Sequence, residues 1–377
     1  MDKIVYFDNS ATTELNDEVF DSMKEFLIKN YSNPSSIYEF SQKSKVAIEK
    51  SRENISEYIN ANKNEVFFTS SGTESDNWAL VGSTVRKRKV GHIITSAFEH
   101  SAVLETVKFL ETMGFEVSYV FPNSDGFISS KDVVDCVRDD TVLVSIMYVN
   151  NEVGTVQNIK QICEAVKEKN SSVIFHTDAV QALSELKIDV KNLDVDLLTV
   201  SAHKVHGPKG VGALYIKSGV EIENFIFGGS QERNRRGGTE NVAGIVGFSK
   251  AIDILRKERV ENVEKRLALR KYFIGKLEKC GYKYKINGSM ENRHSSNINV
   301  SFLGFEKEMM IMNLDFLGIC VSSGSACSSG SIQNSHVLES MNLPYEQKNT
   351  AIRISLSENN TFSEIDYFFE MLKSVLN

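Results

Sequence analysis

Residues 172–216 read SVIFHTDAVQALSELKIDVKNLDVDLLTVSAHKVHGPKGVGALYI, and this stretch decides the fold. It contains short runs of apolar and β-branched residues at 172–178, 195–201 and 211–216. Runs of this kind predict buried strands. Asp178 therefore falls at the end of one expected strand, and Lys204 falls just after the next.

The same alternation extends outward over residues 65–216. Further runs that predict strands are EVFFTS (65–70), HIITS (92–96), FEVSYV (115–120) and TVLVSIMYV (141–149). The segments 101–114 and 158–170 between them have the apolar spacing of amphipathic helices. We therefore predict an α/β fold with a mostly parallel seven-stranded sheet and active-site loops at the strand ends.

The length of the chain, 377 residues, exceeds the size at which one core usually stops growing, so we expect two domains. A long helical pattern covers 242–278, and short strand-like runs mixed with helical segments follow it. We expect a large domain over 15–258. Residues 1–14 and 259–377 would then form a smaller α+β domain.

Composition excludes several classes of protein. The net charge of -7 argues against a general nucleic-acid binder, and the basic run Arg86–Lys89 is expected to be a solvated helix end. No apolar stretch approaches the length of about 18 residues that a membrane span needs, and the first residues do not resemble a signal peptide. The five cysteines form no C-x-x-C pair, so their spacing fits neither a disulfide framework nor a zinc site. We expect a cytoplasmic protein with free thiols.

The segment SAHKVHGPKG places Lys204 among small and polar residues after a strand. Electropositive neighbours such as His203 and His206, together with desolvation, would lower the pKa of a lysine and leave its amine nucleophilic. Lys204 is thus a candidate for forming a Schiff base. The alternative is a surface lysine in a glycine-rich loop. The segment GPKGVG lacks the spacing of a P-loop.

Two other strand ends carry candidate cofactor ligands. Asp178 could keep a pyridine nitrogen protonated, although an aspartate there is more often a helix cap. In TSSGTESDN, Gly72 and Thr73 would present backbone N–H groups and a hydroxyl at a helix N-terminus, where anions bind. A plain capped helix is the alternative for this segment.

Cys327 lies at the centre of VSSGSACSSGS, a run of serines and glycines. A structural cysteine is expected among apolar neighbours, as Cys320 is in LGICV. The surroundings of Cys327 instead favour an exposed thiol on a flexible loop, which suits a nucleophile that must travel. A linker that happens to contain a cysteine is the alternative.

Taken together, these segments resemble the cysteine desulfurases of the NifS/IscS type, within the class V aminotransferase family of fold-type-I pyridoxal-phosphate enzymes. The resemblance covers nearly the whole chain. It is carried, in this order, by YFDNSATT, NPSS, FFTSSGTESDN, HIITSAFEHSAV, VNNEVG, HTDAVQ, SAHKVHGPKGVGALY, GGSQERNRRGGTEN, SSGSACSS and IRISLS. The SSGSACSS loop matches the NifS/IscS branch rather than the branch with an R-x-G-H-x-C motif.

The resemblance implies pyridoxal 5'-phosphate as cofactor and assigns residues to its ring. Lys204 would bind the cofactor covalently and later move the Cα proton of the substrate. Asp178 would pair with the pyridinium nitrogen, and Gln181 would contact the ring hydroxyl. His100 would stack on the ring and transfer protons, and Asn151 would lie beside the ring hydroxyl and the substrate.

The resemblance also assigns the phosphate and the substrate. The residues expected to hold the phosphate within one subunit are Gly72, Thr73, Ser201 and His203. Thr239 would reach the phosphate of the partner subunit, which implies a homodimer. Arg353 would bind the substrate carboxylate through two parallel hydrogen bonds.

The implied activity is the conversion of L-cysteine to L-alanine, with Cys327 as the nucleophile that carries the sulfur as a persulfide. The sulfur would pass to an acceptor protein, which could be an iron–sulfur scaffold, a tRNA-thiolation protein or a cofactor-biosynthesis protein. A selenocysteine lyase or a related aminotransferase is the alternative enzyme, although an aminotransferase has no need of the cysteine loop. A non-catalytic binding protein of the same fold conflicts with the complete set of site residues.

The chain departs from the usual family pattern at several positions. Ser357 and Glu358 stand where glycine and arginine are usual, close to the expected carboxylate-binding arginine. Tyr38 and Ser41 replace a common histidine and glycine, and Phe98 replaces a common threonine. The exchange at 357 and 358 puts the fit of the substrate end in question.

Overall fold

The computed structural model describes residues 4–85, 90–324 and 335–376. Its largest sheet has the strand order β2-β8-β7-β6-β5-β3-β4. The strands are β2 (Val66–Thr69), β3 (His92–Ser96), β4 (Glu116–Val120), β5 (Thr141–Ser145), β6 (Ile174–Asp178), β7 (Leu197–Ser201) and β8 (Gly212–Ile216). Neighbours from β7 to β4 are parallel, and β8 is antiparallel to both β7 and β2. This confirms the predicted seven-stranded, mostly parallel sheet.

One strand is shorter than predicted: β5 ends at Ser145, whereas the sequence pattern predicted a strand to residue 149. Beyond it, the N–H of Met147 donates to the Glu99 carboxylate and the N–H of Tyr148 donates to the Asp178 carbonyl. These partners satisfy the backbone outside the ladder and turn the chain along the strand ends.

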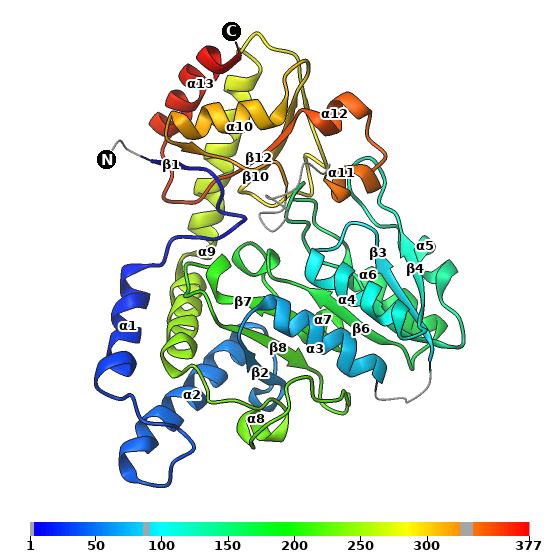
Figure 1. Cartoon of the computed structure of the whole chain (residues 1–377), viewed down its shortest axis with the longest axis vertical. Coiled ribbons are helices and arrows are strands. Elements are labelled where there is room, and N and C mark those ends of the chain that lie inside the picture. The colour runs from blue at the N-terminus through cyan, green and yellow to red at the C-terminus, as the bar shows by residue number, and fades with distance from the viewer. Residues whose placement is uncertain (1–3, 86–89, 325–334, 377) are drawn as a thin grey trace.

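Helices cover both faces of the sheet. On β8, Ala213 and Tyr215 belong to one apolar cluster, whereas Leu214 and Ile216 belong to another. Alternate residues of a strand point to opposite faces, so the sheet has a core on each side. Figure 1 shows α3 and α4 in front of the sheet. The helices of this part of the chain are α1 (Asp17–Ile28), α2 (Glu39–Tyr58), α3 (Gly72–Val85), α4 (Ser101–Thr112), α5 (Ser130–Cys136), α6 (Ile159–Lys169), α7 (Val190–Leu193) and α8 (Gln231–Asn234).

A long helix, α9 (Val242–Leu277), connects this unit to a second core, as Figure 1 shows. Phe248 on its first half packs into a core of the large sheet, whereas Phe273 on its second half packs into the second core. The predicted helix over 242–278 is thereby confirmed. We keep 258/259 as a proposed domain boundary within α9.

The second core is built around small sheets. One has the antiparallel order β12-β10-β9, and the other pairs β1 with β11 in parallel. Their strands and helices are β1 (Val5–Tyr6), β9 (Tyr284–Ile286), β10 (Asn297–Phe302), β11 (Ile319–Cys320), β12 (Ala351–Ser355), α10 (Lys307–Phe316), α11 (His336–Ser340), α12 (Tyr345–Asn349) and α13 (Phe362–Leu376). This mixture confirms the predicted smaller α+β part, and it brings the first strand of the chain beside the last ones.

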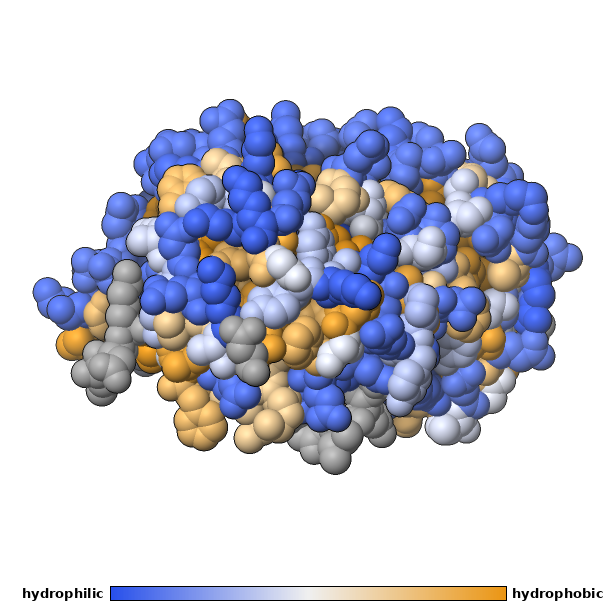
Figure 2. Space-filling model, turned by 90° about the horizontal axis from the view of Figure 1, so that it is seen from above, coloured by the Kyte–Doolittle hydropathy of each residue, from blue (hydrophilic) through white to orange (hydrophobic). Residues whose placement is uncertain are grey.

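The outer surface is mixed in character. Figure 2, a view from above Figure 1, shows a mainly hydrophilic face with apolar side chains scattered over it. Within the described part of the chain, no helix combines the length and the apolar character that a membrane crossing requires. The basic run Arg86–Lys89 lies outside the described residues.

The second core should depend strongly on Phe273, which is fully buried with its ring centroid 5.1 Å from that of Phe368 and 4.8 Å from that of Phe369. We expect Phe273→Ala to lower the free energy of unfolding by about 3–5 kcal/mol, because truncation removes apolar contacts and leaves a cavity. Urea denaturation of the whole chain measures the change. The matched control is Phe316→Ala, because Phe316 is 83% exposed. Equal losses for the two variants would contradict the described packing.

Candidate active site

A cavity of about 160 Å³ lies where several strands end. Strands β2 and β7 run in the same direction because each is antiparallel to β8, and β6 is parallel to β7. Their carboxyl ends therefore meet at one edge of the sheet. The predicted residues that line the cavity are Gly72, Thr73, His100, Asn151, Asp178, Gln181, Ser201, His203, Lys204 and Arg353.

Lys204 ends a short 3-10 turn (Ala202–Lys204) that follows β7. Its Nζ donates to the carbonyls of Ser10 (2.5 Å) and Ala11 (2.8 Å), which belong to the segment after β1. Gln181 Nε2 donates to the same Ser10 carbonyl at 2.9 Å. The N-terminal segment thus holds the lysine amine at the cavity wall.

The pKa values of the two histidines near Lys204 shift in opposite directions. Burial, with smaller effects of Lys204 and Lys209, lowers the pKa of His203 to about 4. The pKa of His206 is raised, because hydrogen bonds to Glu358 and to the Glu14 backbone outweigh the effect of burial. His203 is therefore neutral at pH 7, so the expected electropositive neighbour at 203 is not present.

Asp178 and a second carboxyl group, Asp76, lie together on the cavity wall. Burial raises the pKa of Asp178 to about 6. Burial, together with the charge of Asp178, raises the pKa of Asp76 well above its usual value. Because two buried carboxylates repel each other, the pKa of Asp76 is raised further than burial alone would raise it. A cation placed at Asp178 would relieve this repulsion.

Asp178 also caps the following turn, because its Oδ1 accepts from the N–H of Val180 at 2.9 Å. The sequence pattern allows two roles for Asp178, as a cap and as the partner of a pyridine nitrogen. The two roles are compatible, because one capping bond leaves other acceptor positions of the carboxylate unused. Behind it, His176 contacts Ser145 through Nδ1 (2.9 Å) and Thr199 through Nε2 (3.1 Å). Burial lowers the pKa of His176 to about 3, so this support is neutral.

The first turn of α3 forms part of the cavity wall. Gly72 and Thr73 begin this 14-residue helix and line the cavity. A Cβ on Gly72 would lie 2.9 Å from Val180 Cγ2, so a larger residue would crowd the wall. Ser201 Oγ is buried and has no hydrogen-bond partner among the described residues. A helix N-terminus beside a vacant hydroxyl donor suits a phosphate group.

His100 is the N-cap of α4, and its Nδ1 accepts from the N–H of Ala102 at 3.1 Å. Burial, then the charges of Lys204 and His336, lower the pKa of His100 to about 4. The ring is therefore neutral at pH 7 with its proton on Nε2. A neutral imidazole on the cavity wall can take part in proton transfer without adding charge to the cavity.

Arg353 on β12 is almost fully buried and lines the same cavity. Its Nη2 donates to Asp8 Oδ1 (2.6 Å) and its Nη1 donates to the Asn151 carbonyl (3.2 Å). Its Nε is buried without a partner among the described residues. The guanidinium therefore keeps a donor for an incoming carboxylate.

One predicted residue, Thr239, does not line this cavity, and another, Cys327, cannot be placed relative to it. Thr239 is exposed in the loop after α8, away from the cavity of its own chain. Cys327 lies outside the described residues, but both flanks of its segment are described. The backbone of Ser322 pairs with Arg353, Ser335 Oγ donates to the Glu152 carboxylate, and His336 Nε2 lies 2.8 Å from the Glu99 carbonyl. Both flanks thus contact residues beside the cavity.

Sequence reasoning missed other residues of the wall, among them Ser10, Ala11, Asp76 and Met147. In the segment TESDN, Asp76 could be interpreted only as an acidic residue that favours the start of a helix. Nothing in that pattern showed that the first turns of α3 would bury it beside Asp178. Ser10 and Ala11 act through backbone carbonyls, which leave no signal in residue type.

The comparisons with known proteins agree with this geometry. The family model described as "Aminotransferase class-V" matches residues 5–368. A protein of Clostridium botulinum named "Cysteine desulfurase IscS" is 48% identical over all of this chain and 95% of its own length. A protein of the same name from Methanosarcina thermophila is 46% identical over 99% of this chain and 92% of its own.

Solved structures show the same likeness. A "NifS-like protein" has a TM-score of 0.93 at 38% identity, with 99% of each chain covered. A structure titled "SspA in complex with cysteine" has a TM-score of 0.84 at 35% identity and covers 95% of this chain and 100% of its own. The chain belongs to the class-V aminotransferase family, among the cysteine desulfurases of the NifS/IscS type.

Proposed function

We propose that this chain uses pyridoxal phosphate to take sulfur from L-cysteine, and that it releases L-alanine and carries the sulfur as a persulfide on Cys327. The observation that carries the proposal is the meeting, in one cavity, of Lys204, Asp178, the N-terminus of α3 and Arg353. These groups are an amine, an acid, an anion site and a carboxylate receptor. The family membership and the cysteine-bound structural relative support the same activity.

The residues present fit the cofactor. Pyridoxal phosphate, when bound, supplies an aldehyde that links to an amine and a pyridinium ring that accepts electrons from a substrate carbon. Lys204 would provide the amine, and the raised pKa of Asp178 would fall again beside a pyridinium cation. Ser201, Gly72, Thr73 and His203 would hold the phosphate, while Gln181, Asn151 and His100 would surround the ring.

The substrate would be oriented by Arg353, whose vacant Nε makes a second hydrogen bond to a carboxylate possible. Lys204 and the neutral His100 would move protons to and from the substrate carbon. The Cys327 thiolate would attack the substrate sulfur, forming the S–S bond while the C–S bond breaks and its electron pair stays with the carbon. A proton added to that carbon gives alanine, so the sulfur gained by Cys327 balances the sulfur lost by cysteine. An acceptor protein would then take it.

Covalent attachment of the cofactor is tested with Lys204→Ala. Borohydride reduction of the protein incubated with pyridoxal phosphate should leave a modified peptide at residue 204 in the unaltered chain and none in the variant, because the only proposed amine is gone. Peptide mass mapping reads the result. Lys209→Ala is the matched control, since Lys209 is exposed in the same loop. A reduced adduct found on Lys209 would refute the assignment.

The role of Cys327 is tested with Cys327→Ser, which nearly preserves size but removes the soft, ionisable nucleophile. The variant should still bind pyridoxal phosphate and cysteine, seen as changes in visible absorbance, but should form alanine at less than about 1% of the normal rate. Cys320→Ser on β11 is the control and should keep its activity. If Cys327→Ser forms alanine and sulfide at the normal rate, this thiol is not the sulfur acceptor.

A homodimer with shared sites is proposed because Thr239 is exposed and does not line the cavity of its own chain. Thr239→Val and Lys204→Ala should each be nearly inactive as pure dimers. Mixed dimers should recover activity, because one site then combines an intact Lys204 with the partner subunit's Thr239. Native mass spectrometry verifies mixing, and alanine formation measures recovery. Confirmed mixed dimers without recovery, or full activity of Thr239→Val alone, would exclude sharing.

A further inference from the structure

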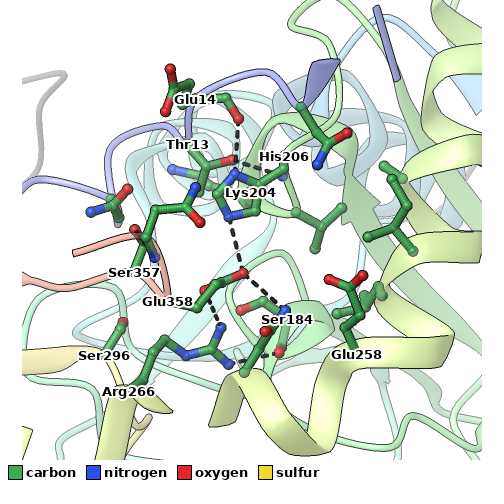
Figure 3. A pocket seen from close by; sticks show the side chains of 18 of the residues that line it. Thr13, Glu14, Ser184, Lys204, His206, Glu258, Arg266, Ser296, Ser357 and Glu358 are labelled. Carbon is green, nitrogen blue, oxygen red and sulfur yellow. Dashed lines mark hydrogen bonds and ion pairs between the residues drawn. The ribbon is translucent and has the colours of Figure 1, made fainter. Parts of the chain in front are cut away.

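A second, larger cavity of about 310 Å³ adjoins Lys204 (Figure 3). Separate parts of the chain form its wall: the segment after β1, the loop after β7, helix α9 and the segment after β12. Within it, Figure 3 shows a continuous set of contacts from Glu14 through His206 and Glu358 to Arg266. None of these residues has a part in the chemistry proposed above.

The ring of His206 lies between two acceptors. Its Nδ1 is 2.9 Å from the Glu14 carbonyl oxygen, and its Nε2 is 3.3 Å from Glu358 Oε1. Neither a carbonyl nor a carboxylate can donate a proton. Nδ1 must therefore donate to the Glu14 carbonyl, and the contact of Nε2 with Glu358 is an ion pair only if Nε2 carries a proton as well. This position between two acceptors favours the imidazolium form, in the same direction as the raised pKa of His206.

Glu358 is fixed from its other side. Its Oε1 accepts from Asn262 Nδ2 at 3.2 Å, and its Oε2 accepts from Arg266 Nη1 at 2.9 Å. Arg266 is itself held by Glu185 (3.2 Å) and Ser295 (2.8 Å). The interaction with His206 and the charge of Arg266 together outweigh burial and lower the pKa of Glu358 to about 2. The carboxylate is thus an ionised, rigidly held anchor.

His206 is equally fixed in its backbone. Its N–H donates to Thr13 Oγ1 at 2.8 Å, its carbonyl accepts from the N–H of Asn16 at 3.1 Å, and its φ is +59°. This left-handed conformation is costly for a residue with a Cβ, so surrounding contacts must hold it. His206 is two residues from Lys204, and Glu358 is three residues after β12, which carries Arg353.

We propose that Glu358 is a positioning residue, and that its ion pair with the His206 imidazolium fixes the turn bearing Lys204 relative to the strand bearing Arg353. This inference rests on the proposed roles of those two residues. An amine and a carboxylate receptor that act on one small substrate must keep a constant separation, because small misplacements reduce rates steeply. Glu358 stands at the position where the resemblance to the family led us to expect arginine.

The pair also predicts a pH dependence. The charged or titratable groups that line the cavity around His206 come from every packed segment: Glu14, Asp17, Lys204, Glu258, Lys265, Arg266, His294 and Glu358. Because the pKa of His206 is raised on folding, the pair stabilises the fold fully below the ordinary histidine pKa of about 6.5. That contribution is lost as the pH rises through the raised pKa.

The test uses Glu358→Gln in the full-length, cofactor-loaded protein. NMR titration of 15N-labelled histidine should show the pKa of His206 falling by about 1 or more, because a neutral amide no longer stabilises the imidazolium. The kcat for alanine formation should fall about tenfold or more at pH 7.5, with KM for cysteine changing less than about twofold. The alkaline limb of the pH–rate profile should move to lower pH.

The matched control is Glu258→Gln, because Glu258 lines the same cavity and Figure 3 draws no contact for it. It should change neither the pKa of His206 nor kcat. His206→Asn removes the pair from the other side while keeping a residue that tolerates the left-handed conformation. It should reproduce the loss of kcat, and the double variant should lose no more than either single variant, as coupled residues do.

An unchanged pKa of His206 in Glu358→Gln would show that the pair does not exist. A lowered pKa with normal kcat would show that the pair has no positioning role, and additive losses in the double variant would show the same. Failure of the proposed function would look different, because the unaltered protein itself would then form no alanine.

Discussion

The constraint on which the rest of the structure depends is the burial of the large sheet on both faces. With helices on each side, the strand interiors accept apolar residues almost throughout, and polar chemistry is confined to the strand ends. Because β2, β6 and β7 share a direction, those ends meet at one edge. This shared direction brings the carboxylate of Asp178, the first turn of α3 and the turn that carries Lys204 to one edge, where the Ser10 and Ala11 carbonyls hold the lysine amine.

Several polar atoms in the wall of the cavity at that edge lack a hydrogen-bond partner in the part of the chain that the structure describes. Asp76 Oδ1, Ser201 Oγ and Arg353 Nε are buried without a hydrogen-bond partner among the described residues. Each buried polar group without a partner typically lowers the stability of the folded chain by about 1–3 kcal/mol. Such a group is explained where a bound ligand supplies the missing partner. The three unpartnered atoms would be satisfied by different groups. A cation or a hydrogen-bond donor would suit Asp76 Oδ1, an anion would suit Ser201 Oγ beside α3, and a carboxylate would suit Arg353 Nε. Pyridoxal phosphate together with an amino acid carries all of them.

Local signals in the sequence predicted part of this site, whereas residues such as His100, Asn151 and Arg353 were expected only from the resemblance to the family. Asp178 and Lys204 each follow an apolar run, and Gly72 opens a helix, so periodicity alone places them at strand ends. The residues that escaped prediction act over long sequence separations. Asp76 becomes a cavity acid only when α3 packs over β6 and β7, and the Glu358–His206 pair joins segments that no local pattern connects. The exchange of arginine for glutamate at 358 was visible in the sequence, but its partner was not.

The central claim is that these strand ends form the cofactor site. A crystal structure of the protein crystallised with pyridoxal phosphate tests it most directly. The account predicts electron density continuous with Lys204 Nζ, the ring nitrogen beside Asp178, and the phosphate against Gly72, Thr73 and Ser201. Density for the cofactor in the cavity beside Glu358, or a phosphate bound away from the first turn of α3, would contradict it.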